Sequence, residues 1–158
     1  METASLSIIK KELKILPPDV LQELVVRLAK YKKENKELLS YLLFETQNEQ
    51  AFIESVKEEM DEQFTRLNRT SLYLAKKTLR KVLRTTNKYI RFSGSKQTEI
   101  ELRLYFCEKM RNMGYRLKNN RVLFNVYQRQ VQLIQNAWSK LHEDLQFDYE
   151  EAVKKLSL

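Results

Sequence analysis

The stretch RLNRTSLYLAKKTLRKVLRTTNKYIRF, residues 66–92, decides the fold that the sequence predicts. Its apolar residues recur at spacings of three and four, which is typical of a helix that buries one side. The opposite side carries cations, which at about 100° per residue fall within an arc of roughly 140°. These candidate binding residues are Arg66, Arg69, Lys76, Lys77, Arg80, Lys81, Arg84, Lys88 and Arg91. We therefore expect one continuous amphipathic helix that starts at Asn68 or Thr70 and ends near Phe92.

The rest of the chain also favours helices. It contains two Gly and two Pro among 158 residues, and sheet proteins need many more such residues for their tight turns. The sequence predicts an all-α fold of seven to eight helices in antiparallel hairpins, within a single domain over residues 1–158. The packing is expected to be either a helical bundle or a short α-solenoid of the HEAT or armadillo kind.

Local signals predict where helices begin and end. Pro17 and Pro18 end the first helix, because neither can donate a backbone hydrogen bond. Asn48 is expected to cap the fourth helix. Gly94 suits the left-handed conformation that often ends a helix. Thr98 has a glutamate three residues later, so a capping box is expected to start the sixth helix there.

Two further helices are expected after Gly114. One should run from about Arg121 to Leu141, with an apolar stripe that includes Trp138. A short last helix is expected to open at Asp148 and end near Leu156. These assignments leave connections of only a few residues, which favours antiparallel neighbours.

One short pattern occurs twice. Glu37-Leu38-x-x-Tyr41-Leu42 is similar to Glu101-Leu102-x-x-Tyr105-Phe106, 64 residues later. Each copy falls within an expected helix, so the pair would fit two copies of a small helical unit. This is the observation that favours a solenoid over a bundle.

The N-terminal third also resembles a known family. The pattern Lys11-Glu12-Leu13-x-x-Leu16-Pro17-x-Asp19-x-x-x-Glu23-Leu24, with Tyr31-Lys32-Lys33, Asn35-Lys36-Glu37 and Tyr41 after it, looks like the start of a family of uncharacterised bacterial helical proteins. Leu102-x-Leu104-Tyr105-Phe106-x-Glu108 is similar to a later segment of that family. The resemblance implies a helical fold and no particular activity. This chain has extra residues before the first helix of the family pattern.

Residue types that carry enzyme chemistry are scarce. His142 is the only histidine and Cys107 the only cysteine, so one chain cannot supply four Cys and His ligands for a structural zinc. His142 is expected to cap a helix or lie on the surface, and Cys107 to be a small buried apolar residue. Glu58 and Glu62 share a helix face without the Glu-x-x-His pattern of carboxylate metal sites. We expect no enzyme, no metal, no cofactor and no small-molecule substrate.

The positive charge is concentrated in the middle of the chain. Residues 63–98 hold 10 Lys and Arg and no acid, whereas residues 1–62 hold 9 Lys and Arg and 13 Asp and Glu. No acid lies between Glu108 and Glu143, so five later cations extend the trend: Arg111, Arg116, Lys118, Arg121 and Arg129. A concentration of positive charge of this kind affects which partners the protein attracts, and not its fold.

Several interpretations of the cations remain open. The acidic helix around Glu54 to Glu62 could neutralise them, or they could simply be solvated. They could also bind nucleic acid, an acidic protein or a membrane surface. Aromatic residues that could stack on bases are Tyr73, Tyr89, Phe92 and Tyr115.

The sequence therefore predicts a cytoplasmic, non-enzymatic binding or scaffold module that uses a basic helix face. The alternative is a nucleic-acid-binding protein that contacts phosphates without reading sequence. An enzyme with a groove site is a third, weaker possibility. No transmembrane segment is expected, because no apolar run approaches the ~20 residues that span a bilayer. The oligomeric state stays open.

Overall fold

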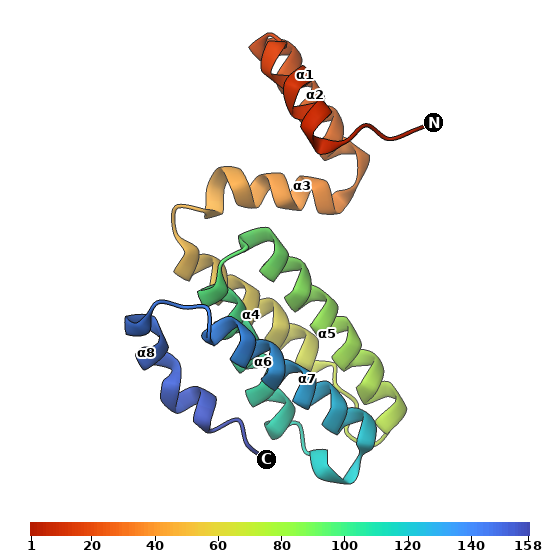
Figure 1. The fold of residues 1–158 in the computed structure, drawn as a ribbon. Helices are drawn as coiled ribbons and strands as arrows, with labels where there is room; N and C mark the ends of the chain where they lie inside the picture. Colours follow the sequence, from red (N-terminus) through yellow and green to blue (C-terminus); the bar gives the residue numbers. More distant parts are fainter. The chain divides into compact units, whose positions relative to one another are not determined.

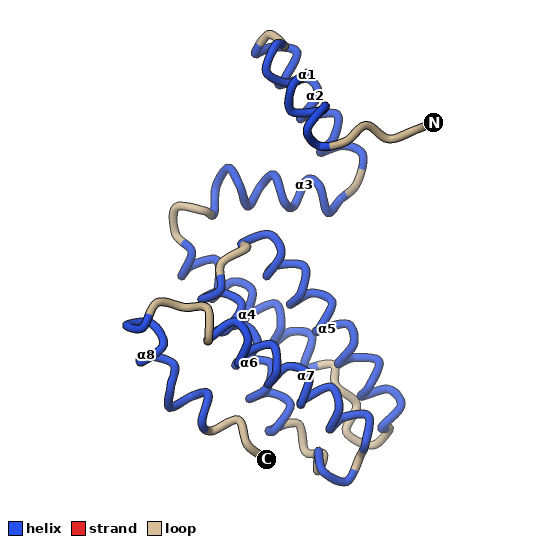
Figure 2. The backbone as a smooth tube through the Cα atoms, viewed as in Figure 1, coloured by secondary structure: helices blue, strands red, loops and turns tan.

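The chain is all-α, with eight α-helices and no strand (Figures 1 and 2). This computed structural model describes residues 1–158, and it confirms the expected fold class and helix count. No helix combines the length and the apolar character that a bilayer-spanning segment requires. The chain divides into two compact units, Met1–Phe44 and Glu45–Leu158. A single domain over residues 1–158 stays a prediction.

The N-terminal unit contains three helices: α1 (Leu6–Ile15), α2 (Pro18–Tyr31) and α3 (Lys33–Ser40). Ser5 caps α1, since its side chain accepts a hydrogen bond from the backbone N–H of Ile8 at 3.4 Å. Pro18 opens α2, as expected for a residue that lacks the N–H group left unsatisfied there. No residue of these three helices is buried.

A π-helical turn over Tyr41–Glu45 follows α3. The five helices of the second unit come after it: α4 (Glu49–Thr65), α5 (Leu72–Ser93), α6 (Lys96–Asn112), α7 (Arg121–Trp138) and α8 (Glu143–Lys154). A 3₁₀ turn, η2 (Leu117–Asn119), joins α6 to α7. Asn48 caps α4 and Gly94 ends α5 with φ at 68°, which confirms both expectations.

The helices α4 to α7 form an antiparallel bundle with α6 at its centre (Figure 1). α6 packs against α4, α5 and α7, and α8 packs against α7. The central position explains why α6 is buried around most of its circumference, from Ile100 to Met110. The bundle core also includes Met60 of α4, Val82 of α5 and Tyr127 of α7, each fully buried.

Two helix starts differ from the expectation. α6 begins at Lys96 because Ser95 caps it, so Thr98 lies inside the helix and not at its cap. The Thr98 hydroxyl donates instead to Glu49 of α4 at 2.6 Å, a partner that local sequence does not reveal. α8 begins at Glu143 rather than Asp148, because the His142 side chain caps it.

The two copies of the short repeated pattern lie in different local structure. The first runs from α3 into the π-helical turn, where Tyr41 is buried. The second lies in the middle of α6, where Leu102 is fully buried.

Candidate functional site

The predicted cationic residues do not all lie on one helix. α5 begins only at Leu72, where Ser71 provides the cap. The Asn68 side chain accepts a hydrogen bond from the Ser71 N–H at 2.6 Å and holds the preceding segment in a turn. The expected helix start at Asn68 or Thr70 was therefore too early. Arg66 and Arg69 lie in the connection between α4 and α5.

The other seven cations share one side of α5, and we call them the α5 cationic face. Most are exposed, and two are partly buried at the edge of the face. The opposite side of α5 is buried in the bundle, including Leu79, Val82 and Thr86. The members of the face are Lys76, Lys77, Arg80, Lys81, Arg84, Lys88 and Arg91.

The carboxylates of α4 bond side chains of both α5 and α6: Glu59 accepts a hydrogen bond from Tyr89 of α5 at 2.7 Å, and Glu49 accepts one from Thr98 of α6 at 2.6 Å. Asp61 forms an ion pair with Lys109 at 2.6 Å and accepts a hydrogen bond from Tyr105 at 2.7 Å. Burial by itself would raise the pKa of Asp61, but the hydrogen bonds from Lys109 and Tyr105 outweigh it and lower the pKa. In contrast, five members of the α5 cationic face take part in no ion pair: Lys76, Lys77, Arg80, Lys81 and Arg84.

Only one of the four candidate stacking residues is exposed. Tyr73 keeps 75% of its surface exposed and precedes Lys76 and Lys77 by one helical turn. Tyr89 packs edge-on against Phe92 and donates a hydrogen bond to a glutamate of α4. Phe92 is buried, and Tyr115 is partly buried with its hydroxyl bonded to the α4–α5 connection.

A shallow apolar groove borders the α5 cationic face, between α5 and the first turns of α7. Its residues are Lys76, Leu79, Arg80, Leu83, Val122, Leu123 and Val126. Arg129 is exposed and follows Val126 by three residues, so it shares that side of α7. Of the five later cations, Arg111 is directed at the C-terminal segment, since it donates hydrogen bonds to the backbone carbonyls of Lys155 and Ser157.

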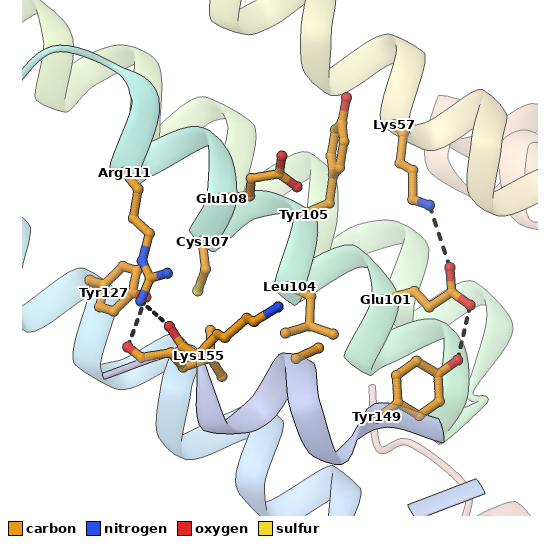
Figure 3. A pocket seen from close by; sticks show the side chains of 12 residues that line it. Lys57, Glu101, Leu104, Tyr105, Cys107, Glu108, Arg111, Tyr127, Tyr149 and Lys155 are labelled. Carbon is orange, nitrogen blue, oxygen red and sulfur yellow. Dashed lines mark hydrogen bonds and ion pairs between the residues drawn. The ribbon is translucent and has the colours of Figure 1, made fainter. Parts of the chain in front are cut away.

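A separate cleft of about 530 Å³ lies between α6, α7 and α8, with Lys57 of α4 at its edge (Figure 3). Its volume falls within the range of small-molecule sites. Several of its polar side chains bond one another or the backbone. The Tyr127 hydroxyl, for example, donates to the carbonyl of Leu156 at 2.9 Å.

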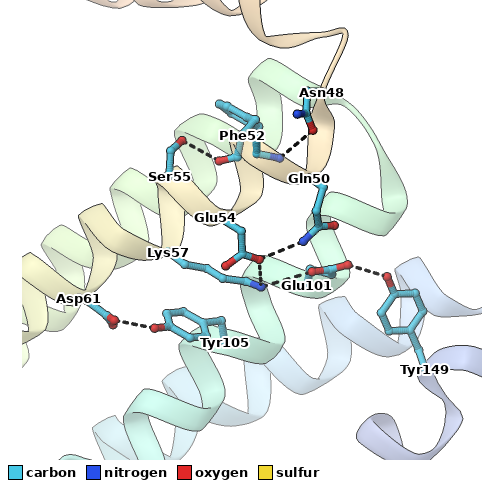
Figure 4. A network of polar contacts seen from close by, with 11 residues as sticks. Asn48, Gln50, Phe52, Glu54, Ser55, Lys57, Asp61, Glu101, Tyr105 and Tyr149 are labelled. Atoms are coloured by element: carbon cyan, nitrogen blue, oxygen red, sulfur yellow. Dashed lines mark hydrogen bonds and ion pairs between the residues drawn. The ribbon is translucent and has the colours of Figure 1, made fainter.

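A polar network joins α4, α6 and α8 beside this cleft (Figure 4). Lys57 contacts Glu54 at 2.9 Å and Glu101 at 3.4 Å, and Tyr149 donates to Glu101 at 2.9 Å. Burial lowers the pKa of Lys57, but the hydrogen bond with Glu54 and the attraction of Glu101 raise it overall. The network therefore ties the three helices together.

The cysteine and the histidine, the residue types most often used in catalysis, are placed unfavourably for that role. Cys107 is fully buried, and burial raises the pKa of its thiol to about 12, so almost no thiolate forms near neutral pH. His142 is exposed and caps α8, as expected for a capping histidine. No group of three or more His, Cys, Asp or Glu side chains could hold a metal ion.

Comparison with models of known protein families, with curated proteins and with solved structures finds no match to this chain. The properties of the site therefore rest on its own geometry. Sequence analysis placed the seven α5 cations together, because helical periodicity is a local signal. It missed the cleft and the exposure of Tyr73, because both depend on which helices pack side by side.

Proposed function

We propose that this chain is a non-enzymatic helical binding module whose α5 cationic face binds the phosphate backbone of nucleic acid without reading its sequence. The observation that supports this proposal is the lack of ion pairs at five neighbouring exposed or partly exposed cations. The proposal includes a cytoplasmic location and assigns no reaction.

Repulsion within α5 favours an external anion. Lys76, Arg80, Arg84 and Lys88 follow one another at intervals of four residues, and like charges at that spacing each cost a few tenths of a kcal/mol. No acid lies anywhere on α5 to relieve this repulsion. A bound polyanion would relieve it and would also release condensed counterions, which strengthens binding.

The shape of the face favours nucleic acid over an acidic protein. From Lys76 to Arg91 the cations extend over about 22 Å at the helical rise of 1.5 Å per residue. A regular row of cations suits the regular charge of a phosphate backbone. Contacts to phosphates carry no base information, so binding should depend little on sequence. Tyr73 at the start of the row could stack on an unpaired base.

The test is a salt titration of binding to labelled random-sequence oligonucleotides, both single-stranded and duplex. The affinity should fall steeply with salt. In a plot of log affinity against log salt concentration, the downward slope should be about 0.7 to 0.9 for each phosphate contacted. The triple variant Arg80→Glu, Lys81→Glu, Arg84→Glu should abolish binding at moderate salt. The matched control is Lys10→Glu, Lys11→Glu, Lys14→Glu on α1, which changes the net charge equally at another exposed site.

Two outcomes would overturn the proposal. One is the absence of binding at low salt. The other is equal loss of binding in the α5 and α1 triple variants, which would indicate a general effect of net charge. Salt-sensitive binding to polyglutamate but not to either oligonucleotide would instead identify an acidic protein as the partner of the face.

Tyr73 offers a second, independent measurement. The substitution Tyr73→Ala should weaken single-strand binding by about 5- to 150-fold, because stacking contributes roughly 1–3 kcal/mol per base, and should change duplex binding little. Phe147→Ala is the control, since Phe147 is an aromatic residue with a similar exposed fraction, 78% against 75%. An equal effect of Tyr73→Ala on both strand forms would contradict stacking.

A further inference from the structure

Two connections that contain no acid meet at one end of the bundle (Figure 1). The Tyr115 hydroxyl, between α6 and α7, donates to the backbone carbonyl of Asn68, between α4 and α5, at 3.0 Å. We call the exposed cations of these connections and of the first residue of α7 the basic end of the bundle. None of them takes part in an ion pair. The members of the basic end are Arg66, Arg69, Arg116, Lys118 and Arg121.

The groove between α5 and α7 starts at this end and has cations on both walls. Both helices pack on α6, and the groove lies between them. Lys76 and Arg80 of the α5 cationic face form part of the α5 wall. On α7, Arg129 follows Val122 of the groove by seven residues, or about two helical turns, so it lies on the same side. The basic end and the groove therefore form one positively charged path.

The floor of the groove is apolar but small. Leu79 and Leu123 are buried. Three apolar residues of the groove therefore reach the surface: Leu83, Val122 and Val126, of which Val122 keeps 43% exposed. A partner helix would need a row of apolar anchors over several turns, which three residues do not provide. A nucleobase presents a single flat π-face, and a shallow floor of this size suits it.

We infer that the ligand of this path is single-stranded nucleic acid, with phosphates on the cations of the basic end and of both walls, and with a base against the apolar floor. The inference rests on the proposed function of α5 and adds the strand form and the course of the ligand. Single strands offer bases whose faces and edges are free to make contacts. In a duplex the bases are paired and stacked on one another, so the apolar floor would gain little.

A comparison of strand forms separates the two kinds of contact. A duplex carries a denser row of phosphates than a single strand, so charge alone would favour the duplex. We expect a labelled random-sequence single strand to bind at least about 5-fold more tightly than the duplex of the same length at the same moderate salt, because base contacts add to the phosphate contacts. DNA and RNA single strands are both measured, by fluorescence anisotropy.

Val122→Asn tests the floor of the groove without a change in charge. It should weaken single-strand binding by about 5-fold or more and leave duplex binding nearly unchanged, because only an unpaired base contacts the floor. The control is Val26→Asn on α2, a valine with nearly the same exposed fraction, 42% against 43%. Helix content by circular dichroism should match that of the original chain in both variants.

The basic end is tested by a neutral triple variant, Arg116→Gln, Lys118→Gln, Arg121→Gln. Loss of three phosphate contacts should lower the slope of log affinity against log salt concentration by about 2 for the single strand, at about 0.7 for each contact. The matched control is Lys10→Gln, Lys11→Gln, Lys14→Gln, which removes three charges from exposed residues of α1 and should keep the slope.

Three outcomes would overturn this inference and leave the proposed function of α5 intact. One is duplex binding as tight as single-strand binding. Another is a Val122→Asn variant without a selective effect on the single strand. The third is an unchanged salt slope in the triple variant of the basic end. The absence of binding to either oligonucleotide at low salt would instead overturn the proposed function, and this inference with it.

Discussion

Arg103 shows how one charged residue can organise a helical core. It lies on α6 and is only 6% exposed, which is unusual for an arginine unless its charge is satisfied. Its guanidinium pairs with Glu99 at 3.1 Å and donates hydrogen bonds to Asn87 of α5 at 3.0 Å and Gln130 of α7 at 2.7 Å. One side chain therefore connects three helices.

We expect Arg103→Ala to lower the free energy of unfolding by about 3–5 kcal/mol, because it removes a buried guanidinium that bonds the buried Gln130 and the partly buried Glu99, whose remaining cation is Lys96. Burial would raise the pKa of Glu99, but the hydrogen bonds from Lys96 and Arg103 outweigh it and lower the pKa. Urea denaturation provides the measurement. Arg129→Ala on the exposed side of α7 is the control and should change the free energy by less than about 0.5 kcal/mol.

A matching test uses pH. Since Glu99 has a lowered pKa in the folded chain, its contribution to stability is present above its unfolded pKa and is lost as the pH falls. The Arg103→Ala variant should show a weaker dependence of stability on pH below pH 5. A variant as stable as the original chain would show that the buried guanidinium contributes no net stability.

At the scale of the element, α5 is defined by its two ends. Ser71 begins it and Gly94 ends it, with the Gly94 N–H donating to the carbonyl of Ile90 at 2.9 Å. Gly94 has φ at 68°, and no atom lies within 4 Å of the position that a β-carbon would occupy. The position therefore favours glycine because of its backbone conformation and not because of crowding.

We expect Gly94→Ala to cost about 1–2 kcal/mol of unfolding free energy, the penalty for a left-handed residue with a β-carbon. Gly94→Asn should cost less, because asparagine tolerates this conformation better. Thermal or urea unfolding of both variants would measure the difference. Equal costs for alanine and asparagine would contradict an explanation based on backbone conformation.

At the scale of the whole molecule, the buried Cys107 and the partly buried Tyr149 make the bundle sensitive to high pH. Burial raises the pKa of Cys107 from 9.0 to about 12 and that of Tyr149 from 10.0 to about 12. The unfolded chain ionises these groups at lower pH than the folded chain does. Stability is therefore full below pH 9 and decreases as the pH rises toward 12.

The measurement is the free energy of unfolding at pH 7.5, 9 and 10.5, at constant ionic strength. Cys107→Ala should reduce the loss between pH 9 and 10.5, because the alanine cannot ionise in either state. Tyr73→Phe, at a site that is 75% exposed, is the control variant. An unchanged pH profile in Cys107→Ala would mean that the thiol ionises equally in both states.

The sequence by itself determined the all-helical class and most of the breaks between helices. Pro17, Asn48 and Gly94 act through their own backbone and nearest neighbours, so their effects can be deduced from order along the chain. The cations of α5 fall on one side for the same reason, because a helix of known period places residues three and four apart together.

Only the tertiary structure decided which charges are paired and which aromatic residue is exposed. Asp61 pairs with Lys109, a residue 48 positions later, and so does not neutralise the α5 cationic face. Arg103 is buried although its neighbours in sequence give no sign of it, and Tyr73 is exposed while Tyr89 is packed. These outcomes depend on which helix lies beside which, and the periodicity of a single helix contains no information about its neighbours.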